Sequence, residues 1–314
     1  MPGIVGPAAT VSRPEMTHSR YTRDRGLAWR MGVTMFLLGL LYVVVIGLLL
    51  ALGIGWFFAL VIASGALLAQ WYFSDRIALY SMAAREVTAE QAPQLHEVID
   101  RLCSLADMPK PRVAIADTDM PNAFATGRSP NRAVVCVTTG LLRRLDVEEV
   151  EGVLSHELSH VAHRDVLVMT VASVAGVVAG FITRMALWGG LGRARDRDQN
   201  AAVIVVAVLL VSVLVYAVSF VLTRMLSRYR ELAADRAGAL LTGRPSALAS
   251  ALTKVSGEIA AIPSQDLRER QALNAFFFAP ALSSGNSLAN LFATHPPLQQ
   301  RLENLARISA DLER

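Results

Sequence analysis

Two histidines and a glutamate in the middle of the chain have the residue types and the spacing of a metal site. His156, Glu157 and His160 form the pattern H-E-x-x-H. Residues four apart lie on one face of an α-helix, so both imidazoles can bind one metal ion. The adjacent carboxylate can take a proton from a water on that ion, which is the chemistry of zinc hydrolases. The pattern therefore predicts hydrolysis at a zinc site.

A helix must carry these residues, and the sequence predicts one from Asp146 to Asp165. Asp146 is a good N-cap residue, and two glutamates follow in the first turn, where the helix dipole favours negative charge. Valine and leucine recur at helical spacing along the same stretch. A surface helix with ordinary histidines is the alternative. Three of the six histidines fall in this stretch, which favours the metal site.

Zinc bound by two histidines needs a third protein ligand and one open position for water. We expect that ligand to be Glu231, with Asp235 one helical turn further on to accept the free N–H of a ligand histidine. A solvated, charged helix face is the alternative, since arginines surround both residues. His163 and Asp165 are nearer in sequence. However, a rigid helix would spread three histidines over about two turns, and Asp165 would be turned off the face of His160.

The composition indicates a membrane protein. The chain has 314 residues, 53% of them hydrophobic, and a mean hydropathy of +0.41. The net charge of +4 comes almost wholly from arginine, because Lys110 and Lys254 are the only lysines. This suits contact with an anionic lipid bilayer, and nothing indicates a nucleic-acid partner. Cys103 and Cys136 are expected to be reduced core residues rather than a disulfide.

Three charge-free apolar runs, at 31–73, 166–183 and 201–223, are long enough to cross a membrane. Residues 31–73 carry no charge and predict two crossings joined by a tight turn, and residues 166–223 contain two further apolar runs. Five arginines in the tail of residues 1–30 place the N-terminus in the cytoplasm. The arginines of the loop 189–200 conflict with this rule if the later runs cross. Short tilted helices over the site are therefore the alternative for 166–223.

This pattern predicts five consecutive segments. They are a disordered basic cytoplasmic tail (1–30), a transmembrane hairpin (31–73), a first catalytic part with the metal helix (74–165), two more membrane helices (166–223) and a second catalytic part with the third ligand (224–314). An even number of crossings returns Glu231 to the side of His156. The predicted fold class is an α-helical integral membrane protein with about four transmembrane helices and a zincin-like catalytic domain, mainly α with a small β-sheet.

The first catalytic part contains candidate strands at 112–116 and 133–138, separated by a turn-rich stretch. An edge strand beside the metal helix could pair with an extended peptide through main-chain hydrogen bonds. Residues 122–126 or 133–137 could serve, and an ordinary internal strand is the alternative for each. The candidate substrate-binding residues are Asn122, Ala123 and Phe124.

Five blocks in order carry a resemblance to a known family: NAFATG at 122–127, TTGLL at 138–142, EGVLSHELSHVAHRD at 151–165, RELAADRAGA at 230–239 and THPPLQQRLENL at 294–305. With these blocks and the paired apolar runs, the chain resembles the M48 metallopeptidases, and among them the HtpX-type bacterial membrane proteases. The resemblance covers about residues 25 to 308 and leaves out the N-terminal tail.

The resemblance implies one zinc ion per chain, held by the ligands His156, His160 and Glu231. It implies that Glu157 is catalytic and that Asp235 orients a ligand. It also implies roles near the substrate for His295 and Arg301. A donor such as His295 or Arg301 would stabilise the oxyanion. It further implies a multi-pass protease of the plasma membrane, with its catalytic domain facing the cytoplasm, that cleaves misfolded or damaged membrane proteins under stress. A prenyl-protein protease of the same family and a non-catalytic membrane scaffold are the alternatives.

Overall fold

The computed structural model describes residues 71–185, 199–261 and 295–314, together with the isolated positions 37, 40, 61, 65, 68 and 69. The predicted tail (1–30), nearly all of the predicted hairpin (31–73) and most of the predicted loop (189–200) lie outside the described residues. The described elements are α3 (Ser74–Ser81), β1 (Arg85–Glu86), α4 (Pro93–Ala106), β2 (Arg112–Ala116), β3 (Ala123–Thr126), the 3-10 turn η1 (Pro130–Arg132), β4 (Val134–Thr138), α5 (Thr139–Arg144), α6 (Val147–Ala162), α7 (Asp165–Met185), α9 (Gln199–Thr242), α10 (Pro245–Ala261) and α13 (Leu298–Leu312).

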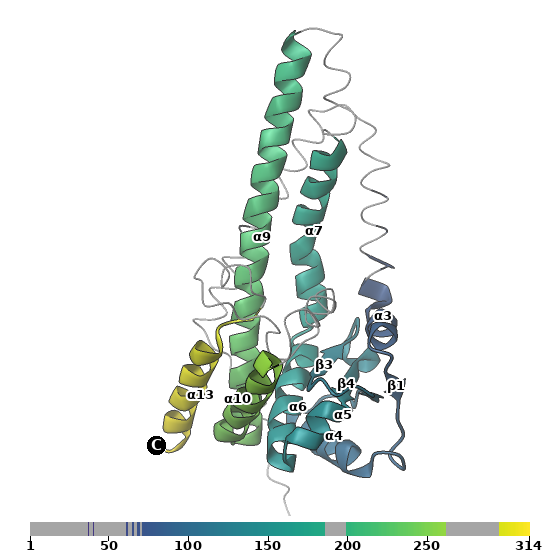
Figure 1. Cartoon of the computed structure of the whole chain (residues 1–314), viewed down its shortest axis with the longest axis vertical. Helices are drawn as coiled ribbons and strands as arrows, with labels where there is room; N and C mark the ends of the chain where they lie inside the picture. The colour runs from purple at the N-terminus through teal and green to yellow at the C-terminus, as the bar shows by residue number, and fades with distance from the viewer. Residues whose placement is uncertain are drawn as a thin grey trace, which may run out of the picture.

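Two long helices rise from a body that holds the remaining described elements (Figure 1). Helix α7 packs along α9, and the lower part of α9 packs against α6. The sheet, α4 and α5 lie on one side of α6, while α10 and α13 lie on the other side with the end of α9. Helix α6, which carries His156 and His160, therefore lies between elements that precede it and elements that follow it in the sequence.

The four strands are arranged in the order β1-β2-β4-β3. Strands β2 and β4 are parallel, and β3 pairs with β4 in antiparallel fashion. The strand predicted at 112–116 is confirmed, and the one predicted at 133–138 begins one residue later. Of the two candidate edge strands, β4 is internal and β3 forms the edge of the described sheet.

Strand β4 is buried on both faces, as its unbroken apolar sequence requires. Val135 and Val137 join the main core with α4 and α6, whereas Val134 and Cys136 pack on the opposite side with Ala78 of α3. The sheet therefore forms a packed layer beside α6.

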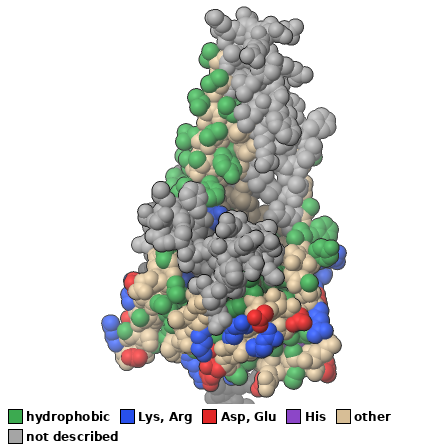
Figure 2. Space-filling model, viewed as in Figure 1, with side chains coloured by type: hydrophobic (Ala, Val, Ile, Leu, Met, Phe, Trp, Pro, Cys, Tyr) green, Lys and Arg blue, Asp and Glu red, His purple; other side chains and the backbone are tan. Residues whose placement is uncertain are grey.

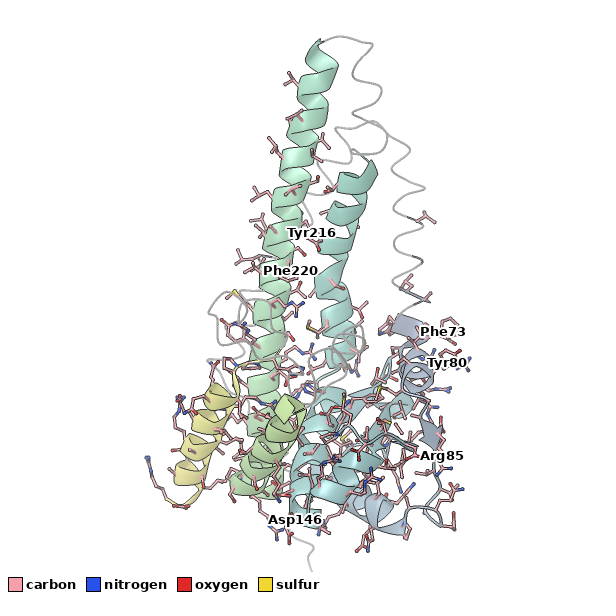
Figure 3. The ribbon with its side chains drawn as sticks, viewed as in Figure 1. Phe73, Tyr80, Arg85, Asp146, Tyr216 and Phe220 are labelled. Carbon is pink, nitrogen blue, oxygen red and sulfur yellow. The ribbon has the colours of Figure 1, made fainter. Side chains whose placement is uncertain are left out.

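Helix α6 begins with the predicted N-cap. The Asp146 carboxylate accepts the N–H of Glu149 at 2.9 Å, and the Glu149 carboxylate accepts the N–H of Asp146 at 3.0 Å. This is a capping box, and Asp146 lies at the lower end of α6 in Figure 3. Glu149 also binds Ser250 and Lys254, so the start of α6 is held against α10.

The predicted end of the metal helix at Asp165 is wrong. Helix α6 ends at Ala162, and Arg164 takes a left-handed conformation with φ of 55°. Asp165 then begins α7, which is bent by 59° relative to α6. A left-handed residue without glycine has no clear local sequence signal, since side chains disfavour it.

Helix α9 runs without a break for 44 residues and joins the last apolar run to the segment that carries Glu231, the predicted third ligand. It lies very close to α6 at Gly238, where an added Cβ would be 2.9 Å from the backbone nitrogen of His156. Glycine is therefore required for α9 to approach the metal helix this closely.

Within the described residues, one helix is long and apolar enough to cross a membrane, at Val206–Thr242. The bent pair α6 and α7 is a second candidate by the same criterion. A mainly helical fold with a small sheet is thus present, while the four predicted crossings stay a prediction.

Both cysteines are expected to be unreactive in the folded protein. Cys103 and Cys136 are buried and free, and burial raises their thiol pKa values to about 11 and about 12. Because the thiolate is the nucleophile, Ellman's reagent at pH 8 should label neither residue until denaturant is added. Rapid labelling of the native protein would contradict this burial.

Candidate metal centre

Three side chains from α6 and α9 meet as a potential metal site. The ligand atoms of His156, His160 and Glu231 all lie within 4.8 Å of one another. The two histidine Nε2 atoms are 3.2 Å apart, and they lie 3.7 Å and 3.5 Å from the nearer Glu231 carboxylate oxygens. Ligands about 2.0–2.1 Å from a tetrahedral zinc would be about 3.3 Å apart. The donor types and their spacing therefore fit zinc, as predicted.

Each histidine is oriented by a carboxylate. Asp235 lies 2.9 Å from Nδ1 of His156, and Asp165 lies 2.5 Å from Nδ1 of His160. A carboxylate that accepts the Nδ1–H fixes the tautomer and leaves Nε2 to bind a metal. The position of Asp235 is the predicted one. The role of Asp165 was missed, because a continuous helix would have turned its side chain away from His160.

The remaining residue of the pattern, Glu157, is buried beside the ligands. Its Oε2 accepts the N–H of Ala125 in β3 at 3.0 Å, and burial raises the pKa of its carboxyl to about 7. Burial also lowers the pKa of His156 to about 4, which favours the neutral imidazole that metals bind. The site thus places a buried carboxylate next to neutral metal-binding rings.

The outer edge of β3 in the described sheet faces this carboxylate. The Ala125 N–H that Glu157 accepts points away from the neighbouring strand β4, so the edge of β3 that pairs with no other described strand lies along the site. The predicted substrate-binding side chains of Asn122, Ala123 and Phe124 are all buried. A peptide could therefore contact this segment through its backbone, and not through those side chains.

His295 and Arg301 both reach the site close to Glu231, and Arg301 Nη1 lies 3.6 Å from Glu231 Oε2. His295 Nδ1 lies 2.9 Å from Glu231 Oε2. The fully buried Arg301 also donates from Nε and Nη2 to Asp235 at 2.8 and 2.6 Å, so its guanidinium lies between Glu231 and the carboxylate that orients His156. These contacts fit an orienting role for Arg301, and a role for either residue at the oxyanion stays a prediction.

Comparisons with known proteins agree on one family. The sequence profile of peptidase family M48 matches residues 89–309. The chain is 60% identical over 294 residues to "Protease HtpX homolog 1" of Streptomyces coelicolor, across 94% of this chain and 96% of that protein. It is 52% identical over 292 residues to "Protease HtpX homolog" of Moorella thermoacetica, across 92% and 97% of the two chains.

A solved structure shares the fold. The crystal structure of S. mikatae Ste24p matches with a TM-score of 0.55 at 13% identity, over 90% of this chain and 67% of that chain. At this identity the match describes the fold alone, and it agrees with a helical protein built around a small sheet.

Proposed function

This chain belongs to peptidase family M48, a metalloprotease family, and we propose that it is a membrane-embedded zinc endopeptidase that cleaves misfolded or damaged membrane proteins. One observation carries the proposal: three zinc-type ligands and the buried Glu157 lie beside the outer edge of β3, which pairs with no other described strand and whose Ala125 N–H is accepted by Glu157. An edge strand can hold an extended peptide with little sequence preference, which suits a protease for unfolded substrates.

The residues of the site would divide the reaction among them. A zinc ion held by His156, His160 and Glu231 would supply a Lewis acid that acidifies water and polarises the scissile carbonyl. Glu157 would accept the proton of the attacking water and pass it to the leaving amine. Asp235 would hold His156 in the tautomer that ligation requires.

The surface of α9 supports a place in the lipid bilayer. Large apolar side chains on its upper half are exposed, among them Val203, Leu210 and Leu214 at 67%, 65% and 63%. Figure 2 shows hydrophobic side chains along the part of α9 that rises above the body, with charged side chains gathered on the body below it. A contiguous exposed apolar surface of this kind needs a lipid or protein cover.

The proposed topology predicts the sides of three fusion points. A reporter fused at Arg76 and one after Arg314 should lie in the cytoplasm, because the arginine-rich tail stays inside and the number of crossings is even. A reporter within 189–200 should lie on the far side. Paired alkaline phosphatase and green fluorescent protein fusions measure this. A cytoplasmic signal from 189–200 would leave only two crossings.

Purified enzyme can separate the proposed function from its alternatives. We expect the zinc-loaded protein in detergent to cleave an unfolded membrane protein, and to cleave it in preference to a farnesylated peptide. Preference for the farnesylated peptide would favour a prenyl-protein protease. Cleavage of neither substrate, by a protein that also holds no zinc, would favour the non-catalytic scaffold.

A further inference from the structure

A second buried charge cluster lies beside the metal site, at the start of α7. The Asp165 carboxylate at the start of α7 accepts from two groups through the same oxygen, Oδ2. His160 Nδ1 lies 2.5 Å from it, and Arg230 Nη2 of α9 also lies 2.5 Å from it. Asp165 and Arg230 are only 4% and 8% exposed. Burying a charged group costs folding free energy unless the charge is paired. Loss of either Asp165 or Arg230 would therefore leave the other as an uncompensated buried charge.

A left-handed backbone conformation at Arg164 allows Asp165 to reach His160 and Arg230. Arg164 has φ of 55° although it carries a side chain. This residue breaks the helix directly before Asp165 and turns the carboxylate back toward His160, five positions earlier. Left-handed residues other than glycine are disfavoured, so the surrounding contacts must hold this one in place.

Arg230 connects the cluster to the third ligand. It precedes Glu231 in α9, and Glu231 Oε1 lies 3.5 Å from His160 Nε2. The two ring nitrogens of His160 therefore face two neighbouring residues of one helix, Nε2 directly and Nδ1 through Asp165. The contact between Asp165 and Arg230 joins α7 to α9 at the level of the ligands.

We propose that Asp165 and Arg230 are positioning residues that orient His160 and fix its distance from Glu231. Asp165 holds the His160 tautomer with Nε2 toward the metal, and Arg230 holds the Asp165 carboxylate away from the metal. The pair is the counterpart for His160 of the group formed by Asp235 and Arg301 behind His156. This inference rests on the proposed zinc site, and it adds two residues that act through a ligand.

Zinc affinity of the full-length protein tests the pair apart from catalysis. Metal-free protein in detergent would be titrated against a fluorescent zinc chelator of known affinity. We expect Asp165→Asn, which keeps the shape and loses the charge, to weaken zinc binding by roughly 10- to 100-fold. Arg230→Ala should weaken it as well, and Arg230→Lys, which keeps the charge, should restore part of the loss.

A matched control lies at the other end of α6. Lys254 pairs with the buried Glu149 at 2.6 Å, far along the helix from the ligands. Lys254→Ala should lower the melting temperature of the metal-free protein and leave zinc affinity unchanged. Melting temperatures of all variants would be measured alongside the titrations, so that a loss of stability is separated from a loss of positioning.

Two results would overturn the inference while leaving the zinc site intact. The first is a zinc affinity of Asp165→Asn equal to that of the wild type. The second is a loss of zinc affinity in Asp165→Asn that is no greater than the loss in Lys254→Ala when both variants show the same drop in melting temperature. A wild-type protein that binds no zinc would instead overturn the proposed function, and this inference with it.

Discussion

Replacing Glu157 by glutamine is expected to abolish peptide hydrolysis while zinc binding and the fold stay intact. Glutamine has nearly the same shape, and its amide oxygen can still accept the Ala125 N–H that Glu157 accepts at 3.0 Å. The amide cannot take the proton of the attacking water, so the rate should fall at least about 100-fold, the lower range for loss of a general base.

The measurement is the initial rate of cleavage of an unfolded membrane protein, together with zinc content and melting temperature. Wild-type rates in Glu157→Gln would contradict the assignment of Glu157. A loss of rate accompanied by a loss of zinc would show that Glu157 supports the site rather than the proton transfer.

Replacing Glu231 by alanine should have the largest effect on the metal. The change removes one of the three ligand groups, and it leaves the buried His295 without the carboxylate that lies 2.9 Å away. Zinc affinity should fall by more than the roughly 100-fold that is typical when a residue that only orients a ligand is lost, and cleavage should disappear. Chelator competition and the cleavage rate measure these two effects.

His163→Ala is the control for this prediction. His163 follows α6 as its C-cap residue and does not belong to the ligand group found among the described residues. Its removal should leave zinc affinity and cleavage largely unchanged. If His163→Ala loses the metal and Glu231→Ala keeps it, the ligand set is wrong.

Local patterns predicted the parts of the site that lie close together in sequence. Asp146 caps α6 as its residue type and the following glutamates indicate, and the helical spacing brings His156 and His160 together on one face. The strand at 112–116 also follows from its own composition. Such features depend on interactions within a few residues, which is why the sequence alone is sufficient for them.

Contacts between distant segments were harder to predict. Glu231 could be chosen as a ligand because zinc coordination limits the alternatives, but nothing local indicated that Gly238 allows α9 to approach α6 so closely. The role of Asp165 depends on the left-handed Arg164, which has no sequence signature. Arg301 was expected near the substrate, and its contact with Asp235 depends on the packing of α13 against α9.

Metal counting tests most directly whether His156, His160 and Glu231 hold one zinc ion. Wild-type protein and Glu231→Ala would be purified in parallel without chelators, and zinc per chain would be measured by inductively coupled plasma mass spectrometry. We expect one zinc per chain in the wild type and close to none in Glu231→Ala. Equal zinc in both proteins, or none in the wild type, would contradict this ligand set.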